Sequence, residues 1–150
     1  MRPYKIYLSG PMTNHTAEQV DGWRGELASM AEHARIEFFS PLRHKSYLKT
    51  GVMKAGKYGG IKDTPGFILG RDFNDVITSD IVVVNFTGVK AYSNGTAMEI
   101  AWAYDRHIPI ILIGEEDNPN VYHPMVSAAC AFKVKTLDEA AECIRTILFP

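Results

Sequence analysis

The run Ile81–Phe86 (IVVVNF) decides the fold class of this 150-residue chain. It is apolar at almost every position, whereas a strand with one face in water alternates apolar and polar residues. A second such run, Pro109–Gly114 (PIILIG), follows a helical pattern at residues 96–106. Buried strands separated by helices are typical of a parallel sheet that carries helices on both faces. We therefore predict an α/β fold with a doubly wound parallel sheet.

The rest of the chain alternates in the same way. Further strands are predicted at 4–9, 36–39 and 132–134, and further helices at 17–34, 67–78, 124–131 and 136–148. This order predicts a flavodoxin-like sheet of about five strands in one domain over residues 1–150. In such sheets ligands bind beyond the carboxyl ends of the strands. The loops to examine are therefore 10–16, 87–96 and 114–123.

The composition indicates a compact protein that acts on a small molecule. Hydrophobic residues make up 46% and charged residues 22%, and the net charge is −1, which argues against a basic surface for a nucleic acid polymer. Two cysteines are too few for a disulfide scaffold and suggest reduced thiols in the cytoplasm. No apolar run approaches the roughly 20 residues of a membrane span, and no signal peptide is recognisable. We expect a cytoplasmic protein without a membrane partner.

Residues 43–66 do not fit the alternation. This segment carries five lysines and five glycines without clear periodicity. A connection of this length without structure of its own is uncommon in a compact domain. It is either a lid or binding loop, or a flexible surface insertion, and the sequence favours neither.

Glu99 is the most informative single residue. It is the only charged residue between Thr96 and Tyr104, in a helix that follows the small residues Ser93-Asn94-Gly95. Such a helix start presents free backbone N–H groups to an anion. Glu99 itself is either the second half of a capping box that Thr96 begins, which the pattern alone favours, or a carboxylate nucleophile. In the second case we expect the helix dipole to keep Glu99 ionised.

Other candidates are weaker. Asp72 and Asp75 share a helix face beside Arg71, and either pair with it or meet water, the solvated face being favoured. Tyr7 is either a core tyrosine, which is favoured, or a hydroxyl that contacts a carboxylate at the sheet edge. The five histidines show no metal-binding spacing, so we expect no metal.

Several segments together carry a resemblance to a known family. They are 4–13 (YKIYLSGPMT), the pair Arg71-Asp72, 79–86 (SDIVVVNF), 93–103 (SNGTAMEIAWA) and 122–125 (YHPM). In this order the chain resembles the nucleoside 2-deoxyribosyltransferases and the related 2′-deoxynucleoside 5′-monophosphate N-glycosidases. The resemblance implies an enzyme of nucleotide salvage that needs no cofactor.

The resemblance also implies catalytic roles. Glu99 is expected to attack C1′ of the deoxyribose and form a covalent glycosyl-enzyme, from which the sugar passes to another nucleobase. Tyr7 is expected to hold the Glu99 carboxylate, and Asp72 to act as general acid for the leaving base. This is the two-carboxylate chemistry of retaining glycosidases with a nucleobase as the leaving group.

The substrate contacts leave the exact activity open. The implied binding residues are Gly10, Pro11, Ser93, Gly95, Thr96, His123 and Met125. Met125 is expected to enter the active site of a neighbouring subunit, so the resemblance implies a homodimer or larger homo-oligomer with composite sites. Ser93 is similar to the glycosidases, which contact a phosphate there, whereas the Gly95–Glu99 segment is more similar to the transferases. His123 matches neither group. The alternatives are a nucleoside deoxyribosyltransferase, a 5′-monophosphate N-glycosidase and, less favoured, a non-catalytic nucleotide-binding module.

Overall fold

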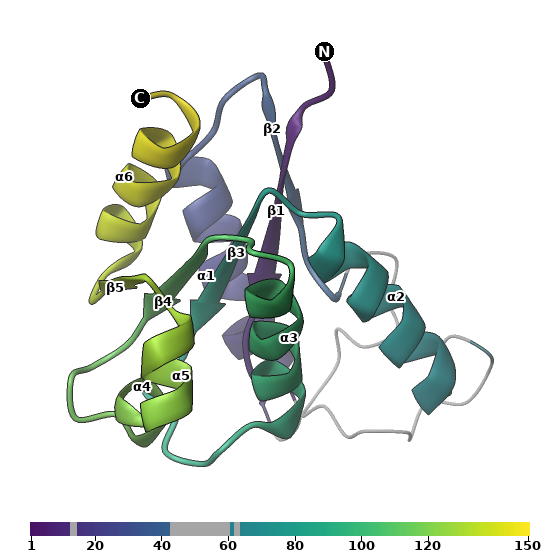
Figure 1. The fold of residues 1–150 in the computed structure, drawn as a ribbon, viewed down its shortest axis with the longest axis vertical. Helices are drawn as coiled ribbons and strands as arrows, with labels where there is room; N and C mark the ends of the chain where they lie inside the picture. Colours follow the sequence, from purple (N-terminus) through teal and green to yellow (C-terminus); the bar gives the residue numbers. More distant parts are fainter. Residues whose placement is uncertain (13–14, 43–60, 62–63) are drawn as a thin grey trace.

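A computed structural model describes residues 1–12, 15–42, 61 and 64–150 (Figure 1). The strands are β1 (Tyr4–Ser9), β2 (Ile36–Phe39), β3 (Ile81–Asn85), β4 (Ile110–Ile113) and β5 (Phe132–Val134). The helices are α1 (Ala17–Met30), α2 (Pro65–Ile77), α3 (Asn94–Asp105), α4 (Pro119–Tyr122), α5 (Pro124–Ala129) and α6 (Leu137–Leu148). All neighbouring strands pair in parallel, in the order β2-β1-β3-β4-β5. This is the flavodoxin-like order, so the predicted fold class is confirmed.

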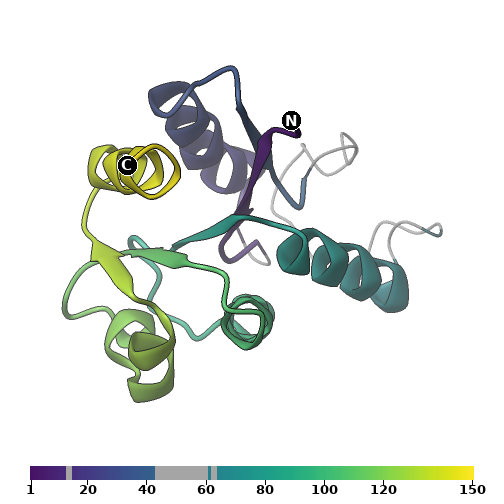
Figure 2. The same cartoon turned by 45° about the horizontal axis from the view of Figure 1, so that its top comes forward.

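The central strands are apolar on both faces because each face carries its own core. Ile81 and Val83 of β3 pack into the core beneath α1 and α6, whereas Val82 and Val84 pack into the core beneath α3 and α5. Figure 2 shows α1 and α6 on one side of the sheet, and α2, α3 and α5 on the other. Alternate side chains of a strand point to opposite faces, so a strand in this position needs apolar residues throughout.

Several helix boundaries differ from the prediction by a few residues. The first helix ends at Met30 rather than at residue 34, because the chain has to turn before β2 begins at Ile36. The second helix begins at Pro65 rather than at residue 67, with Thr64 as its cap. Proline is favoured at the first helical position because its missing N–H would be unpaired there anyway.

Helix α4 was not predicted at all. Its residues were assigned to a polar loop, yet the Asn118 side chain caps the helix and Pro119 occupies its first turn. Asparagine followed by proline is a common start for a helix, and this signal was available in the sequence.

The Lys- and Gly-rich segment is only partly described. Residues 43–60 and 62–63, on which the prediction of a lid or surface insertion rests, lie outside the described residues, and Pro65 and Gly66 belong to α2. Within the described ranges, no helix has the length and apolar character needed to cross a membrane.

Candidate active site

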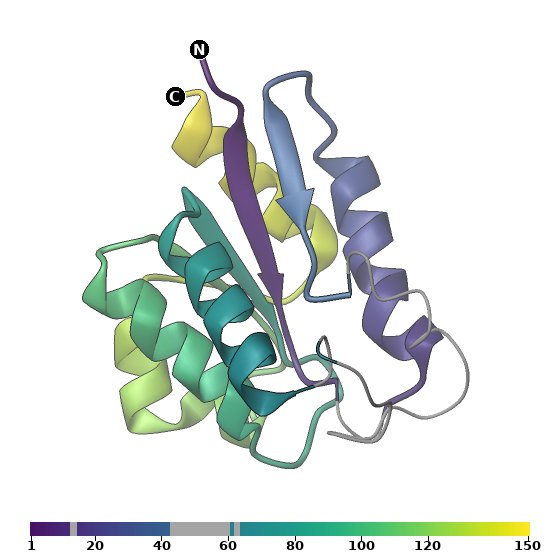
Figure 3. The same ribbon diagram turned by 90° about the vertical axis from the view of Figure 1, so that its right-hand side faces the viewer.

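Two carboxyl groups and a tyrosine converge on the face of the sheet that carries α2 and α3. Tyr7 is fully buried in β1 and belongs to the core beneath α3 and α5. Glu99, from α3, is 9% exposed, and Asp72, from α2, is half-buried. Figure 3 shows α2 and α3 side by side, with β1 next to α2. Burial raises the pKa of Tyr7, and the nearby charges of Glu99 and Asp72 raise it further, so the three groups lie within electrostatic reach of one another.

Glu99 does not cap its helix. The hydroxyl of Ser93 accepts a hydrogen bond from the backbone N–H of Thr96 at 3.4 Å and donates one to the Thr96 hydroxyl at 2.9 Å. The helix therefore begins two residues earlier than predicted, at Asn94, and the expected capping box of Thr96 and Glu99 is wrong. Serine is a strong helix cap, and the earlier start places Glu99 in the second turn, where it faces the sheet.

The protonation of Glu99 also differs from the expectation. Burial raises its pKa to about 8, and the charge of Asp72 acts in the same direction. The hydroxyls of Tyr7 and Ser9 and the charge of Arg24 oppose this increase. The prediction that the helix dipole keeps Glu99 ionised is wrong, because the dipole effect fades within the first turn and loss of water dominates deeper in the protein.

Three buried oxygens in this region lack partners. Among the described residues, the hydroxyls of Tyr7 and Ser9 and the Oε2 atom of Glu99 make no hydrogen bond. Buried polar atoms in folded proteins are almost always paired, so each exception needs an explanation. Their concentration around one carboxyl group indicates a site arranged for a polar ligand.

Asp75 and Asp72 face the protein rather than the solvent. Asp75 is 2% exposed, and its carboxylate lies 3.2 Å from the Lys5 Nζ and 3.9 Å from the Arg71 Nε. The favoured prediction of a solvated face is therefore wrong, because β1 supplies a lysine directly beneath this face of α2. Asp72 lies one turn earlier on α2, and its charge acts on both Tyr7 and Glu99.

The expected substrate-binding residues lie at the carboxyl ends of the strands. Gly10 and Pro11 directly follow β1, and Ser93 and Gly95 lie at the start of α3. At Gly10 a Cβ atom would lie 3.1 Å from the Asn85 carbonyl oxygen, so the close approach of two strand ends favours glycine.

His123 and Met125 lie at the junction of α4 and α5. The His123 ring meets the Tyr92 ring edge-on, with 6.1 Å between the centroids, and Tyr92 directly precedes Ser93. The Nδ1 atom of His123 is buried and has no hydrogen-bond partner in the described part of the chain. Met125 is 77% exposed. The structure thus brings His123 toward the loop that ends at Ser93 and leaves Met125 on the outer surface.

Arg24 on α1 was missed by sequence reasoning. Its guanidinium is buried beneath the end of β1, where it donates to the carbonyl oxygens of Leu8 and Gly10. Arg24 lies four residues after Val20 and three before Leu27, both of which are buried. A charged residue on the buried face of a helix was a usable signal.

Two asparagines next to α4 were also missed. Asn118 donates to the Phe86 carbonyl oxygen at 2.8 Å, and Asn120 donates to the Ala91 carbonyl oxygen at 3.0 Å. These bonds fix the loop that leads from β3 to Ser93. No sequence signal other than the Asn-Pro cap pointed to them.

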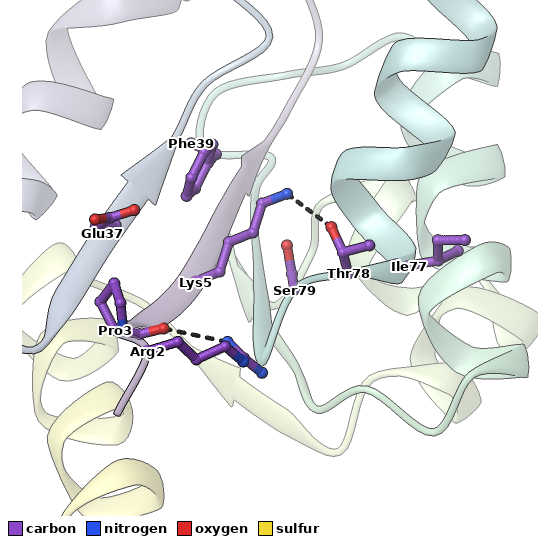
Figure 4. Close-up of a pocket in the computed structure, with 8 residues that line it drawn as sticks. All are labelled: Arg2, Pro3, Lys5, Glu37, Phe39, Ile77, Thr78 and Ser79. Carbon is purple, nitrogen blue, oxygen red and sulfur yellow. Dashed lines mark hydrogen bonds between the residues drawn. The ribbon is translucent and has the colours of Figure 1, made fainter.

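A pocket of about 590 Å³ lies at the opposite edge of the sheet, near the amino ends of β1 and β3 (Figure 4). Its two basic residues have partners, since Lys5 binds Asp75 and Thr78, and Arg2 binds Asp80. None of Tyr7, Asp72 and Glu99 lines it, so it is separate from the candidate active site. No cluster of three His, Cys, Asp or Glu side chains that could hold a metal ion occurs in the residues that the structure describes.

Comparison with solved structures supports the fold. A 2-desoxiribosyltransferase from Leishmania mexicana has a TM-score of 0.64 at 14% identity, with 99% of this chain and 100% of that chain covered. A CMP N-glycosidase from Clostridium botulinum has a TM-score of 0.57 at 18% identity, with 97% and 99% covered. A molybdenum cofactor binding protein from Rippkaea orientalis has a TM-score of 0.62 at 15% identity, with 99% of both chains covered. One fold thus serves both enzymes and a cofactor-binding protein.

Comparison of the sequence is more specific. A search of the curated proteins finds no match. The family model described as nucleoside 2-deoxyribosyltransferase, however, matches residues 6–128, which include most of β1 and all of α2 and α3, with the three converging side chains. The chain therefore belongs to the nucleoside 2-deoxyribosyltransferase family.

Proposed function

We propose that this protein cleaves the N-glycosidic bond of 2′-deoxyribonucleosides and transfers the deoxyribose to another nucleobase. One observation carries the proposal, namely the buried Glu99 carboxyl group with Tyr7 and Asp72 beside it. A carboxylate withdrawn from water is well suited to attack an electron-poor carbon. The family match supports a substrate of the nucleoside class.

In the proposed reactive form the two carboxyl groups share one proton, which lies on Asp72 and leaves Glu99 as the carboxylate. In the first step, an oxygen of the Glu99 carboxylate forms a bond to C1′ as the bond from C1′ to the base nitrogen breaks. Asp72 donates a proton to the departing base, which leaves neutral. In the second step, a nitrogen of the incoming base attacks C1′, Asp72 takes the proton that this nitrogen loses, and Glu99 departs as a carboxylate. Two displacements at C1′ retain the configuration of the sugar, as in retaining glycosidases. Tyr7 orients the nucleophile throughout.

A second candidate is hydrolysis of a 2′-deoxynucleoside 5′-monophosphate, with water as the acceptor. The observation that favours it is the His123 Nδ1 atom, which is buried without a partner among the described residues and lies beside the loop that leads to α3. The start of this twelve-residue helix offers backbone N–H groups that suit a phosphate.

One experiment separates these candidates. The protein is incubated with each deoxynucleoside and each 5′-monophosphate, with and without a second free base, and the products are separated by chromatography. A new nucleoside that forms only with the acceptor base is the expected result. Free base and deoxyribose 5-phosphate from monophosphates alone would favour the second candidate.

Two variants, each with one glutamate replaced by glutamine, test whether the activity depends on Glu99. Glu99→Gln should remove the activity, whereas Glu142→Gln, which changes an exposed glutamate of α6, should retain it. Absence of turnover with every substrate would contradict both enzymatic candidates and favour a nucleotide-binding module.

We also infer that the active protein is a homodimer or a larger homo-oligomer in which Met125 contributes to a neighbouring site. The support is that Met125 is highly exposed, although it directly follows the short segment that holds His123 near α3. An exposed methionine of this kind is typical of an interface.

A further inference from the structure

Arg24 lies beside the carboxyl end of β1, beyond the point where β1 pairs with β2. Strand β2 ends at Phe39, which pairs with Tyr7, so the last residues of β1 extend beyond their neighbour on that side. The Arg24 Nε donates to the Leu8 carbonyl oxygen at 3.1 Å, and its Nη2 donates to the Gly10 carbonyl oxygen at 3.4 Å. The guanidinium thus bonds to the protruding end of β1, where Ser9 and Gly10 border the candidate site.

Among the residues that the structure describes, no carboxylate forms an ion pair with Arg24. The residue is 2% exposed, and its third donor binds the Val20 carbonyl oxygen within its own helix. Within the described ranges Arg24 forms no ion pair, although its guanidinium stacks at 4.6 Å on the Trp23 ring. An isolated buried charge is unfavourable, so a buried arginine without an adjacent carboxylate calls for a compensating group nearby.

Glu99 is such a compensating group on the other side of β1. Burial lowers the pKa of Arg24 to about 10, and the charges of Tyr7, Glu99 and Asp21 oppose this decrease. In return, Arg24 lowers the pKa of Glu99. In the described part of the chain, the groups that act on Glu99 are Tyr7 and Ser9 from β1, Asp72 from α2 and Arg24 from α1, and Arg24 is the one cation among these described groups.

We propose that Arg24 is a positioning residue of this site, which fixes the end of β1 and supplies the buried positive charge that balances the Glu99 carboxylate. Arg24 does not contact the substrate in this scheme, because it is buried and three of its five N–H donors bind carbonyl oxygens of the protein. The kinetic part of the proposal rests on the proposed function, whereas the charge balance between Arg24 and Glu99 does not.

The test uses the full chain in four forms, namely wild type, Arg24→Gln, Arg24→Lys and the control Arg145→Gln. Arg145 also donates to a backbone carbonyl oxygen, that of Met30, but it lies on α6. The Glu99 titration is followed by NMR of carboxyl-¹³C-labelled glutamate, with the resonance assigned from Glu99→Gln. The pH profile of kcat/KM and the value of KM are measured in parallel.

Arg24→Gln removes the charge, so we expect the Glu99 midpoint and the acid limb of kcat/KM to move up by about one pH unit, which lowers kcat/KM near neutral pH about tenfold. Arg24→Lys keeps the positive charge but loses the planar guanidinium that bonds to two carbonyl oxygens of β1. We therefore expect a Glu99 titration midpoint close to that of the wild type and a KM raised roughly tenfold. Arg145→Gln should change neither quantity.

Several results would overturn the proposal. One is an unchanged Glu99 titration midpoint in a folded Arg24→Gln protein. Another is a shift of this midpoint in Arg24→Lys or in Arg145→Gln that equals the shift in Arg24→Gln. If Arg24→Gln does not fold, an unchanged KM in Arg24→Lys would overturn the proposal. Failure of the proposed function is distinguishable from these results. In that case the wild type shows no turnover, while the NMR titration still reports the coupling between Arg24 and Glu99.

Discussion

At the residue scale, Glu99 links the candidate chemistry to stability. Its pKa rises from 4.5 to about 8 on burial, so the folded protein holds the proton more tightly than the unfolded chain does. The destabilisation is absent below about pH 4.5, grows as the pH rises, and is complete above about pH 8. Each pKa unit corresponds to about 1.4 kcal/mol. Burial of the Glu99 carboxyl group therefore costs stability, as is common at sites that serve function rather than folding.

The first prediction follows from the loss of stability that the buried Glu99 causes as the pH rises. Glu99→Gln should unfold at nearly the same temperature as wild type near pH 4.5, and at a clearly higher temperature at pH 8.5, because the amide has no proton to lose. Thermal unfolding by circular dichroism at the two pH values measures the difference. Glu142→Gln is the control and should shift the melting temperature by the same small amount at both. A Glu99→Gln effect that is independent of pH would contradict the buried charge.

Tyr7 provides the second prediction. Its hydroxyl is buried without a hydrogen-bond partner among the described residues, so Tyr7→Phe should leave the melting temperature unchanged or raise it. The same change removes a hydroxyl that lowers the pKa of Glu99. If this hydroxyl donates to Glu99 once the carboxylate is ionised, as proposed, loss of that charged hydrogen bond corresponds to roughly a ten- to hundredfold effect on kcat. Steady-state kinetics and thermal unfolding of one preparation test both parts. A loss of stability with unchanged kcat would identify Tyr7 as an ordinary core residue.

At the element scale, the third prediction concerns the carboxyl end of α3, where His107 follows the last turn of the helix. The N–H of Ile108 bonds to the Ala103 carbonyl oxygen at 2.9 Å, and the N–H of His107 bonds to that of Tyr104 at 3.0 Å, which is the Schellman pattern. His107 has a φ of 57°, a conformation that favours glycine. His107→Gly should therefore stabilise the protein by about 0.5–1 kcal/mol. Chemical denaturation measures the change, and His107→Ala, which keeps the Cβ atom, should give no gain.

The elements also show what local sequence can specify. The strands were predicted almost to the residue, because Ile81–Val84 and Ile110–Ile113 are apolar on both faces and leave no other placement. Helix starts were less accurate, because Ser93 and Thr96 are both acceptable caps and the choice between them depends on packing against the sheet. This ambiguity produced the incorrect capping box at Glu99.

At the scale of the whole molecule, the candidate site depends on contacts between distant segments. The order of the strands in the parallel sheet brings Tyr7, Asp72 and Glu99 together on one face. This proximity cannot be predicted from the local sequence around each residue. The resemblance to a family was needed to connect them. The spacing of Arg24 from Val20 and Leu27 indicates a buried position, but its partners could not be predicted, because they are backbone carbonyl oxygens, which any sequence supplies.

The outer surface of the molecule carries an apolar stripe along α3. Ala97, Met98, Ala101 and Tyr104 are all exposed and recur at the spacing of one helix face. Helix α5, with the exposed Met125, lies beside α3. Exposed apolar side chains grouped in this way are typical of an interaction surface, and the proposed homodimer would cover them.

The last prediction tests this assembly. Met98→Glu places a charge in the middle of the stripe, and burying a charge without a partner is strongly unfavourable. The variant should therefore be monomeric at a concentration at which the wild type is dimeric in sedimentation equilibrium, and its activity should fall because each site would lose the neighbour's Met125. Ala34→Glu adds the same charge at an exposed position between α1 and β2 and should keep both the dimer and the activity. A fully active wild-type monomer would contradict composite sites and leave the stripe without a role in catalysis.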